Sequence, residues 1–265
     1  MNISSIIIAT LILAVLGVLV GLFLGFASDK FAVEVDEKEQ KVRQLLPGNN
    51  CGGCGYAGCD AMAKAIAAGE APVNGCPVGG APVAAAIGEV MGVSAEETEK
   101  KTAFVKCSGT CDKVTVKYEY YGEADCRELG VVPGAGEKGC SHGCMGYGSC
   151  VKACQFDAIH VVNGVAVVDQ EKCTACGACT KVCPNHLIEL LPVSNTVRVF
   201  CSSTDNGKVV RSVCSAGCIG CTLCTRQCEF DAIHVNNFLA KIDPEKCTAC
   251  GKCAEKCPTK VIHVM

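Results

Sequence analysis

Apolar residues form one long run at the start of the chain. Ile6 to Ala27 contains no charged residue, and as a helix rising 1.5 Å per residue it would be about 33 Å long, enough to cross a bilayer core of about 30 Å. A cleaved signal peptide is the alternative, but the first 28 residues contain no Lys or Arg that could form its basic segment. The pattern therefore predicts one transmembrane helix within residues 1–28.

The residues that follow this run are mixed in charge. Lys30, Lys38, Lys41 and Arg43 lie close to the predicted anchor, with acidic residues among them. Because basic residues flank membrane helices mainly on the cytoplasmic side, we expect a single-pass protein of the cytoplasmic membrane whose other residues lie in the cytoplasm. Residues 31–46 are predicted to form a helical stalk.

Past the stalk, apolar runs are short and separated by turn residues. Residues 158–162 and 165–168 flank an Asn-Gly pair, which is typical of a two-residue hairpin turn, and residues 233–242 repeat this pattern. A connecting hairpin is predicted over 193–213. The sequence Ser-Ala-Glu-Glu from Ser94 is a capping box, which predicts a helix running towards Phe104. The fold class is therefore α+β, built from small units.

The spacing of the cysteines indicates which cofactor the chain binds. The chain has 25 cysteines, and their densest pattern recurs 74 residues later: the Cys-x3-Cys-x-Phe-Asp-Ala-Ile-His segment at Cys150 returns at Cys224. Runs that begin at Cys173 and Cys247 both read Cys-x2-Cys-x2-Cys-x3-Cys-Pro. This is the spacing of two-cluster bacterial ferredoxins, in which three close cysteines bind one [4Fe-4S] cluster and the fourth binds the other.

This rule assigns ligands for four clusters. In the second repeat, one cluster takes Cys218, Cys221, Cys224 and Cys257, and the other takes Cys228, Cys247, Cys250 and Cys253. In the first repeat, one takes Cys154, Cys173, Cys176 and Cys179, and the other takes Cys140, Cys144, Cys150 and Cys183. Cys140 completes the last set because Tyr147 stands where the repeat would place the counterpart of Cys221. Cys214, the equivalent of Cys140, is left spare.

A fifth set lies upstream of the repeat. Cys51, Cys54 and Cys59 fall in a Gly-rich stretch, and Cys76 follows a short Ala-rich segment. Glycine lets a backbone turn close to a metal without a steric clash from Cβ. The sequence therefore predicts five [4Fe-4S] clusters as cofactors and no catalytic side chain.

Other uses of these cysteines fit less well. An odd number of cysteines in dense Cys-x2-Cys pairs suits neither disulfides nor zinc ribbons, although zinc is a possible alternative at the fifth set. His142 is an alternative ligand beside Cys140. Five cysteines stay outside the five sets, with free buried thiols as the first interpretation and a sixth metal site on Cys107, Cys111 and Cys126 as the second; the five are Cys107, Cys111, Cys126, Cys201 and Cys214.

The metal sites divide the chain into pieces that are too small to be stable without bound metal. The predicted segments are a transmembrane anchor (1–28), a single-cluster domain with its stalk (29–100), a connecting segment (101–139), the first ferredoxin repeat (140–192), the connecting hairpin (193–213) and the second ferredoxin repeat (214–265). The formal charge is −3, and five oxidised clusters with their thiolates lower it to about −13. Nucleic acid is therefore not an expected partner.

Motifs for other chemistry are absent. No G-x-G-x-x-G after a strand and no Walker A motif occurs, so the sequence shows neither a dinucleotide fingerprint nor a phosphate loop. A chain with clusters alone can relay single electrons, whereas forming NADH requires a two-electron hydride donor such as a flavin. The chain is therefore expected to be an electron carrier.

One family combines these features. The N-terminal apolar run, the stretch Leu-Pro-Gly-Asn-Asn-Cys-Gly-Gly-Cys-Gly-Tyr-Ala-Gly-Cys ending at Cys59, the later Cys-Pro-Val-Gly-Gly from Cys76 and the ferredoxin repeats together resemble the B subunit of the Rnf electron-transport complex. Departures from the simple ferredoxin pattern are Tyr147, and Gln155 and Glu229 where ferredoxins usually have Pro. These departures bear on the redox potentials of the affected clusters and not on whether the clusters are present.

The resemblance implies a function. Proteins of this family are part of a membrane complex, an ion-translocating oxidoreductase, that passes electrons between reduced ferredoxin and NAD through clusters and flavins while pumping Na+ or H+. By this resemblance the chain accepts electrons from soluble ferredoxin, and its partners are the flavin- and NAD-binding subunits. Two alternatives are a related complex that keeps a redox-sensing transcription factor reduced, and a membrane-tethered polyferredoxin that works alone.

Overall fold

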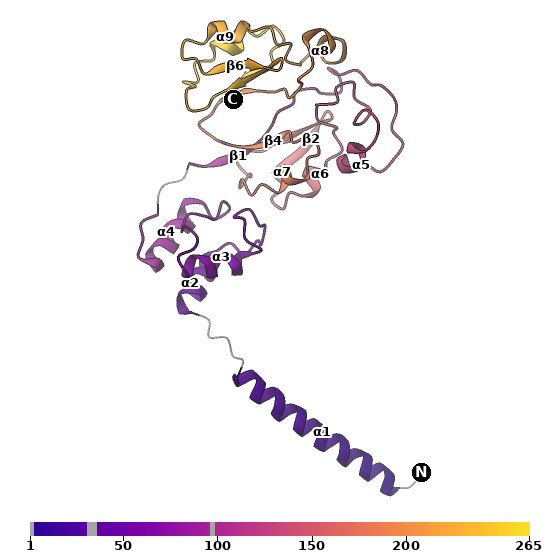
Figure 1. The fold of residues 1–265 in the computed structure, drawn as a ribbon, viewed down its shortest axis with the longest axis vertical. Coiled ribbons are helices and arrows are strands. Elements are labelled where there is room, and N and C mark those ends of the chain that lie inside the picture. The colour runs from indigo at the N-terminus through magenta and orange to yellow at the C-terminus, as the bar shows by residue number, and fades with distance from the viewer. Residues whose placement is uncertain (1–2, 31–35, 96–98) are drawn as a thin grey trace.

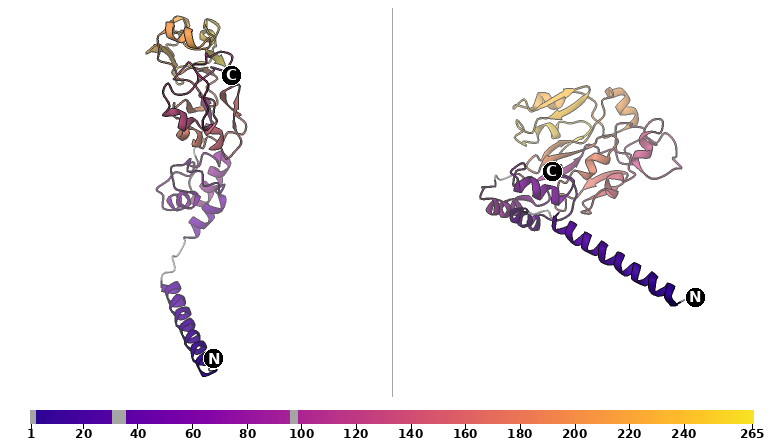
Figure 2. Two further views of the ribbon diagram at one scale, coloured as in Figure 1. Left: turned by 90° about the vertical axis from the view of Figure 1, so that its right-hand side faces the viewer. Right: turned by 60° about the horizontal axis from the view of Figure 1, so that its bottom comes forward.

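The computed structural model describes residues 3–30, 36–95 and 99–265. Three parts follow one another along the molecule: the helix α1 at one end, a small helical domain, and two α+β units at the other end (Figures 1 and 2). We call residues 99–192 the first unit and residues 193–265 the second unit.

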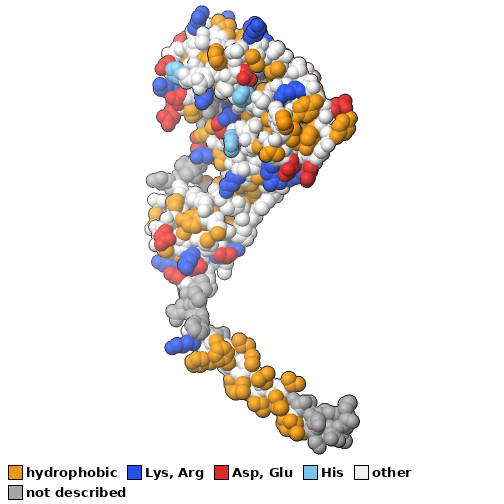
Figure 3. Space-filling view, turned by 45° about the vertical axis from the view of Figure 1, so that its right-hand side comes forward, with side chains coloured by type: hydrophobic (Ala, Val, Ile, Leu, Met, Phe, Trp, Pro, Cys, Tyr) orange, Lys and Arg blue, Asp and Glu red, His pale blue; other side chains and the backbone are white. Residues whose placement is uncertain are grey.

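The N-terminal helix α1 (Ile3–Lys30) covers the apolar run. Its described apolar side chains, from Ile7 to Phe26, are exposed (Figure 3). Within the described part of the chain, no helix is long and apolar enough to cross a membrane. The structure thus does not support the predicted transmembrane helix.

The helical domain contains α2 (Glu37–Leu45), α3 (Cys59–Ala67) and α4 (Gly80–Met91). Asp36 caps α2 by accepting the N–H of Lys38 at 2.9 Å. Val42 on α2 is fully buried in one core with residues of α3 and α4. The part of the predicted stalk that the structure describes is therefore packed into the domain, while residues 31–35 lie outside the described residues.

The first unit holds two small antiparallel sheets. Its elements are β1 (Lys101–Val105), α5 (Cys126–Gly130), α6 (Ser149–Lys152), β2 (Ile159–Val162), β3 (Val165–Val168), α7 (Ala178–Val182) and β4 (Ile188–Pro192). The hairpin β2–β3 turns at the expected Asn163-Gly164 pair, whose φ angles of 47° and 75° suit such a turn. The helix predicted towards Phe104 is wrong, because residues 101–105 pair with β4 as a strand.

The second unit repeats this plan. Its elements are β5 (Val197–Val199), α8 (Gly207–Val213), α9 (Leu223–Gln227), β6 (Ile233–Asn236), β7 (Leu239–Ile242), α10 (Lys252–Glu255) and β8 (Ile262–Val264). The expected hairpin forms from β6 and β7. The hairpin predicted over 193–213 is wrong: β5 pairs with the distant β8, and Asn206 instead caps α8 by accepting N–H groups of Lys208 and Val209.

The segment predicted as a connection, 101–139, holds the two units together. Backbone N–H groups of Ser108 and Thr115 donate to the carbonyls of Phe200 and Val213 at 3.1 and 2.9 Å. The rings of Phe104 and Phe200 meet edge to face, with centroids 4.8 Å apart. This segment is therefore part of the interface between the units.

Candidate iron-sulfur sites

The N-terminal cysteine set lies on the core of the helical domain. Cys54, Cys59 and Cys76 pack against its buried residues, and Cys51 is partly buried in the same loop. The side-chain oxygen of Asn50 accepts the Cys59 N–H at 2.8 Å, which holds the start of α3 in place. Burial raises the pKa of the Cys76 thiol, and the neighbouring Cys54 and Cys59 act in the same direction. A bound cation would stabilise the thiolate and so offset the cost of burying its negative charge.

The first unit gathers one predicted set around a single cavity, the inner site. Its cysteines are Cys154, Cys173, Cys176 and Cys179, around a space of about 340 Å³. Backbone N–H groups point at the sulfurs: Ala103 donates to Cys173 Sγ at 3.4 Å and Ala158 to Cys154 Sγ at 3.5 Å. Burial raises the pKa of Cys179 to about 12. The site is apolar, and its only charged donors would be thiolates.

The second unit has an equivalent cavity, the outer site. Its cysteines are Cys228, Cys247, Cys250 and Cys253, and its volume is again about 340 Å³. The N–H of Ala232 donates to Cys228 Sγ at 3.3 Å, as Ala158 does in the first unit. Unlike its counterpart Cys176, Cys250 is exposed. The repeat therefore reproduces the volume of the site and its cysteine positions but not its burial.

The other predicted set of the second unit shares the buried core of that unit. Cys218, Cys224 and Cys257 are each buried and pack with Val261 and Ile262. Burial raises the pKa of Cys224 to about 11, with Cys218 and then Cys221 adding to the effect. We call Cys218, Cys221, Cys224 and Cys257 the central site.

In the first unit the corresponding cavity, the insertion site, is lined by a cysteine that the sequence did not assign to it. A space of about 410 Å³ is lined by Cys126, Cys144, Cys150 and Cys183. Cys140 was predicted to complete this set, but it lines a neighbouring cavity. The geometry thus replaces Cys140 by Cys126, which lies at the start of α5.

A buried polar network positions Cys126. Ser149 Oγ accepts the N–H of Cys126 at 2.8 Å and donates to Asp125 Oδ1 at 2.7 Å. Asp125 also caps α5 by accepting the N–H of Arg127. Burial raises the pKa of Cys150 to about 12, with Cys144 and then Cys126 as the nearest thiols acting on it. Nothing in the repeat indicates Cys126, because its segment has no counterpart in the second unit.

Tyr147, which replaces a cysteine of the repeat, has a packing role. Its ring meets that of Tyr120 edge to face at 5.8 Å, next to a small core of Cys126, Leu129 and Met145. Burial raises the pKa of Tyr147 to about 12. The inserted segment therefore supplies both the packing partner of this ring and the missing thiol.

The donor sets fit [4Fe-4S] clusters. In the described residues, no group of His, Cys, Asp or Glu was found that could hold a single metal ion; a single zinc ion would need sulfurs converging to about 2.3 Å from one point. The thiols instead stand around apolar cavities and accept backbone N–H groups. Iron-sulfur clusters are held by four thiolates in this way, and N–H donors to sulfur tune their potential.

The helical domain approaches the inner site closely. A Cβ on Gly53 would lie 2.6 Å from the backbone oxygen of Cys176 and 3.0 Å from its Cα. Only glycine therefore fits at position 53, between two loops that each carry cluster cysteines. Within the first unit, Cys179 of the inner site is also close enough to act on the pKa of Cys150.

Two family models match parts of the chain. Residues 46–78 match the FeS family model, described as "Putative Fe-S cluster". Residues 166–189 and 240–263 each match the Fer4 model, "4Fe-4S binding domain". These matches cover the N-terminal set and part of each ferredoxin repeat.

Similar proteins align along nearly the whole chain. The B subunit of the Na(+)-translocating ferredoxin:NAD(+) oxidoreductase complex of Acetobacterium woodii is 46% identical over 98% of this chain and 78% of its own length. The B subunit of the ion-translocating oxidoreductase complex of Methanosarcina acetivorans is 46% identical over 98% of this chain and 99% of its own. The B subunit of the proton-translocating ferredoxin:NAD(+) oxidoreductase complex of Clostridium ljungdahlii is 39% identical over 99% and 93%. The chain belongs to the family of B subunits of the Rnf-type ion-translocating oxidoreductase complexes.

Proposed function

We propose that this chain accepts electrons from reduced ferredoxin and relays them within an ion-translocating ferredoxin:NAD oxidoreductase. Its partners are a soluble ferredoxin and the flavin- and NAD-binding subunits of the complex. The names of the relatives support this activity over a transcription-factor reductase or a polyferredoxin that works alone. Those names include both Na+ and the proton, so the proposal does not specify the ion.

The observation that carries the proposal is the succession of cysteine sites. The outer site has an exposed cysteine, Cys250, whereas the inner site lies against the helical domain that is joined to α1. A donor can thus reach one end of the molecule, and the other end lies next to the N-terminal part. We assign a [4Fe-4S] cluster to each of the five sites, with Cys126 in place of Cys140.

Each part of the chain has a separate task in this relay. A bound cluster supplies one-electron chemistry, which the side chains alone cannot perform. The cysteines hold it, the backbone N–H groups that point at sulfur stabilise its negative charge, and the apolar lining keeps water away. Reduction of NAD is left to a partner, because the sequence shows no dinucleotide fingerprint.

Attachment to the membrane is assigned to α1. Side chains such as Leu13, Leu22 and Phe23 are more than 65% exposed, and so much apolar surface on one helix favours contact with lipid. Deleting residues 1–28 should release the isolated chain from membranes with its iron content unchanged, since no cysteine lies there. Loss of iron on deletion would contradict this division of tasks.

Anaerobic stopped-flow spectroscopy tests the electron-accepting role. Mixing the purified chain with reduced ferredoxin should bleach the visible absorbance of its clusters, while the isolated chain should not form NADH. Absence of bleaching would remove this role. Membranes that contain the whole complex should form NADH from reduced ferredoxin, and replacing Cys257 with Ser should abolish that reaction.

A further inference from the structure

Four cysteines that the five sites do not use come together between the two units. Cys107, Cys140, Cys201 and Cys214 line one cavity of about 450 Å³, which has Cys144 of the insertion site at its border. Its volume is similar to those of the inner, outer and insertion sites. We call this cavity the junction site.

The sulfurs point into a common space. A Cβ on Gly143 would lie 3.5 Å from both Cys107 Sγ and Cys140 Sγ, and one on Gly109 would lie 3.6 Å from both Cys107 Sγ and Cys214 Sγ. Cys201, which like Cys214 belongs to the second unit, lies near them, since Cys140 is among the thiols that raise its pKa. The four therefore surround one volume and are not scattered core thiols.

Each unit contributes the same two ligand positions. β1 and β5 both lead into a Cys-Ser-x-Thr loop, which starts at Cys107 in the first unit and at Cys201 in the second. Cys140 and Cys214 are equivalent by the 74-residue repeat. The junction site thus has an approximate twofold relation between the units.

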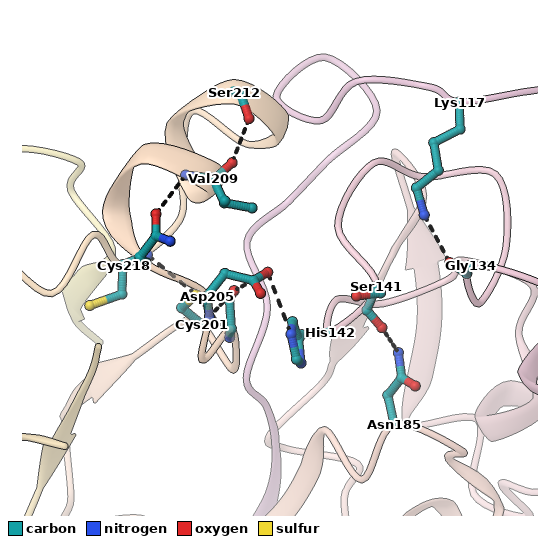
Figure 4. A network of polar contacts seen from close by, with 12 residues as sticks. Lys117, Gly134, Ser141, His142, Asn185, Cys201, Asp205, Val209, Ser212 and Cys218 are labelled. Carbon is teal, nitrogen blue, oxygen red and sulfur yellow. Dashed lines mark hydrogen bonds and ion pairs between the residues drawn. The ribbon is translucent and has the colours of Figure 1, made fainter. Parts of the chain in front are cut away.

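The hydrogen bonds follow the same symmetry. Cys107 Sγ accepts the N–H groups of Gly109 and Cys144 at 3.4 and 3.3 Å. Cys201 Sγ accepts those of Ser203 and Cys218 at 3.4 and 3.3 Å, and Figure 4 shows the contact with Cys218.

Backbone groups also face the other two sulfurs, with His142 donating to Cys140 and Ala216 to Cys214. A neutral thiol is only a weak acceptor, so the N–H donors that face each of the four sulfurs suit thiolates bound to metal.

Lys138 and His142 line the same cavity. Lys138 is 7% exposed, and its Nζ donates to the carbonyl oxygens of Gly109 and Gly164. His142 lies on the wall near the second unit, with Nε2 3.4 Å from Asp205 Oδ2 (Figure 4). A buried ammonium group beside four thiolates would stabilise a negatively charged cluster.

We propose that Cys107, Cys140, Cys201 and Cys214 bind a sixth [4Fe-4S] cluster that joins the two ferredoxin units. On binding, four thiols release their protons to solvent, and an oxidised core of charge +2 with four thiolates carries a net charge of −2. The site lies between Cys144 of the insertion site and Cys218 of the central site, whose N–H groups donate to its sulfurs. It would therefore close the gap between the relays of the two units.

Iron and sulfide content of the full-length chain, purified anaerobically, tests the proposal without ferredoxin or partner subunits. Six clusters give about 24 iron and 24 sulfide per chain, and five give about 20. Native mass spectrometry under anaerobic conditions should resolve the two. A mass for five clusters in the intact chain would overturn the proposal, while the electron-accepting role would still stand.

Variants assign the iron to this cavity. Replacing Cys140 or Cys214 with Ser should each remove about four iron, and replacing both should remove the same four, because they share one cluster. Replacing Cys126 together with Cys214 should remove about eight. Cys111→Ser is the control, because Cys111 is exposed and does not line the cavity. Retention of all iron in the Cys214 variant, or loss of eight in the Cys140 and Cys214 double variant, would overturn the proposal.

Discussion

The sequence Cys-Thr-Ala-Cys-Gly occurs twice in this chain, at residues 173–177 and 247–251, with different surroundings. In the first copy Cys173, Ala175 and Gly177 are buried, whereas in the second copy residues 248–250 are all exposed. Both loops form the wall of a cavity with the same volume. Identical local sequence thus produces the same site but not the same access to solvent.

The difference comes from residues outside the repeat. The loop of Gly53 lies against Cys176, and the helical domain that carries it has no counterpart beside the second unit (Figure 1). Local spacing therefore determines which cysteines meet, while packing from distant segments determines which site a partner protein can reach. On this basis we expect the outer site to be reduced first.

The largest expected effect follows from removing one ligand from each loop. Cys250→Ser should slow the first phase of reduction by ferredoxin about tenfold or more, a barrier increase of at least about 1.4 kcal/mol. Cys176→Ser should lose as much iron but keep that phase, because its site lies further along the relay. Stopped-flow spectroscopy of both variants measures the rate of this first phase and so compares the two sites. Equal slowing in both would contradict acceptance of electrons at the outer site.

The contact between the helical domain and the loop of residues 173–177 can be weakened by a substitution at Gly53. In Gly53→Val the new Cβ would collide with the backbone of Cys176, and such overpacking costs about 1–3 kcal/mol. Amide hydrogen exchange in residues 174–177 should become about tenfold faster, approaching that of residues 248–251. Ala57→Val, at an exposed position of the same domain, is the matched control and should leave the exchange unchanged.

A smaller effect, on the rate of iron loss, is expected from disturbing Cys126, which has no counterpart in the second unit. Ser149→Ala would leave the Cys126 N–H and Asp125 Oδ1 without this partner, at a cost of about 1–3 kcal/mol. A chelator should then remove about four iron from the insertion site several times faster than from the wild type. Ser212→Ala removes an exposed hydroxyl from the second unit and should not change the rate.

The smallest effect concerns charge near the exposed loop. Lys252 pairs with Glu229 at the surface of the outer site, and rim charges act mainly on association rates. Lys252→Gln should slow association with an acidic ferredoxin about two- to threefold at low salt, and the difference should vanish at high salt. Lys208→Gln, on α8 and outside the outer site, is the control. A difference that persists at high salt would mean a specific contact instead.

Local pattern predicted much of the two ferredoxin repeats. The Asn163-Gly164 turn and the 74-residue repeat place both hairpins correctly. The four-cysteine runs bring the inner and outer sets together, because neighbouring cysteines in a tight loop have little freedom to lie elsewhere.

Features that depend on distant pairing were missed. β1 was predicted as part of a helix, since its partner β4 lies about 90 residues away in sequence. Cys126 has no equivalent in the repeat. The loops of Cys107 and Cys201 are 94 residues apart instead of 74, because the first unit carries about 20 additional residues that include Cys126. The recurring Cys-Ser-x-Thr sequence is the signal that could have revealed their equivalence.

The contacts of residues 101–139 with the second unit have a practical consequence for protein production. A fragment that begins at residue 193 would lose the hydrogen bonds that Ser108 and Thr115 donate to Phe200 and Val213, each worth about 0.5–1.5 kcal/mol. It would also leave Cys201 and Cys214 without Cys107 and Cys140. Expressing the two halves from separate genes would therefore create exposed thiols and aggregation-prone surfaces, and the cut should instead be placed at residues 96–98, ahead of β1.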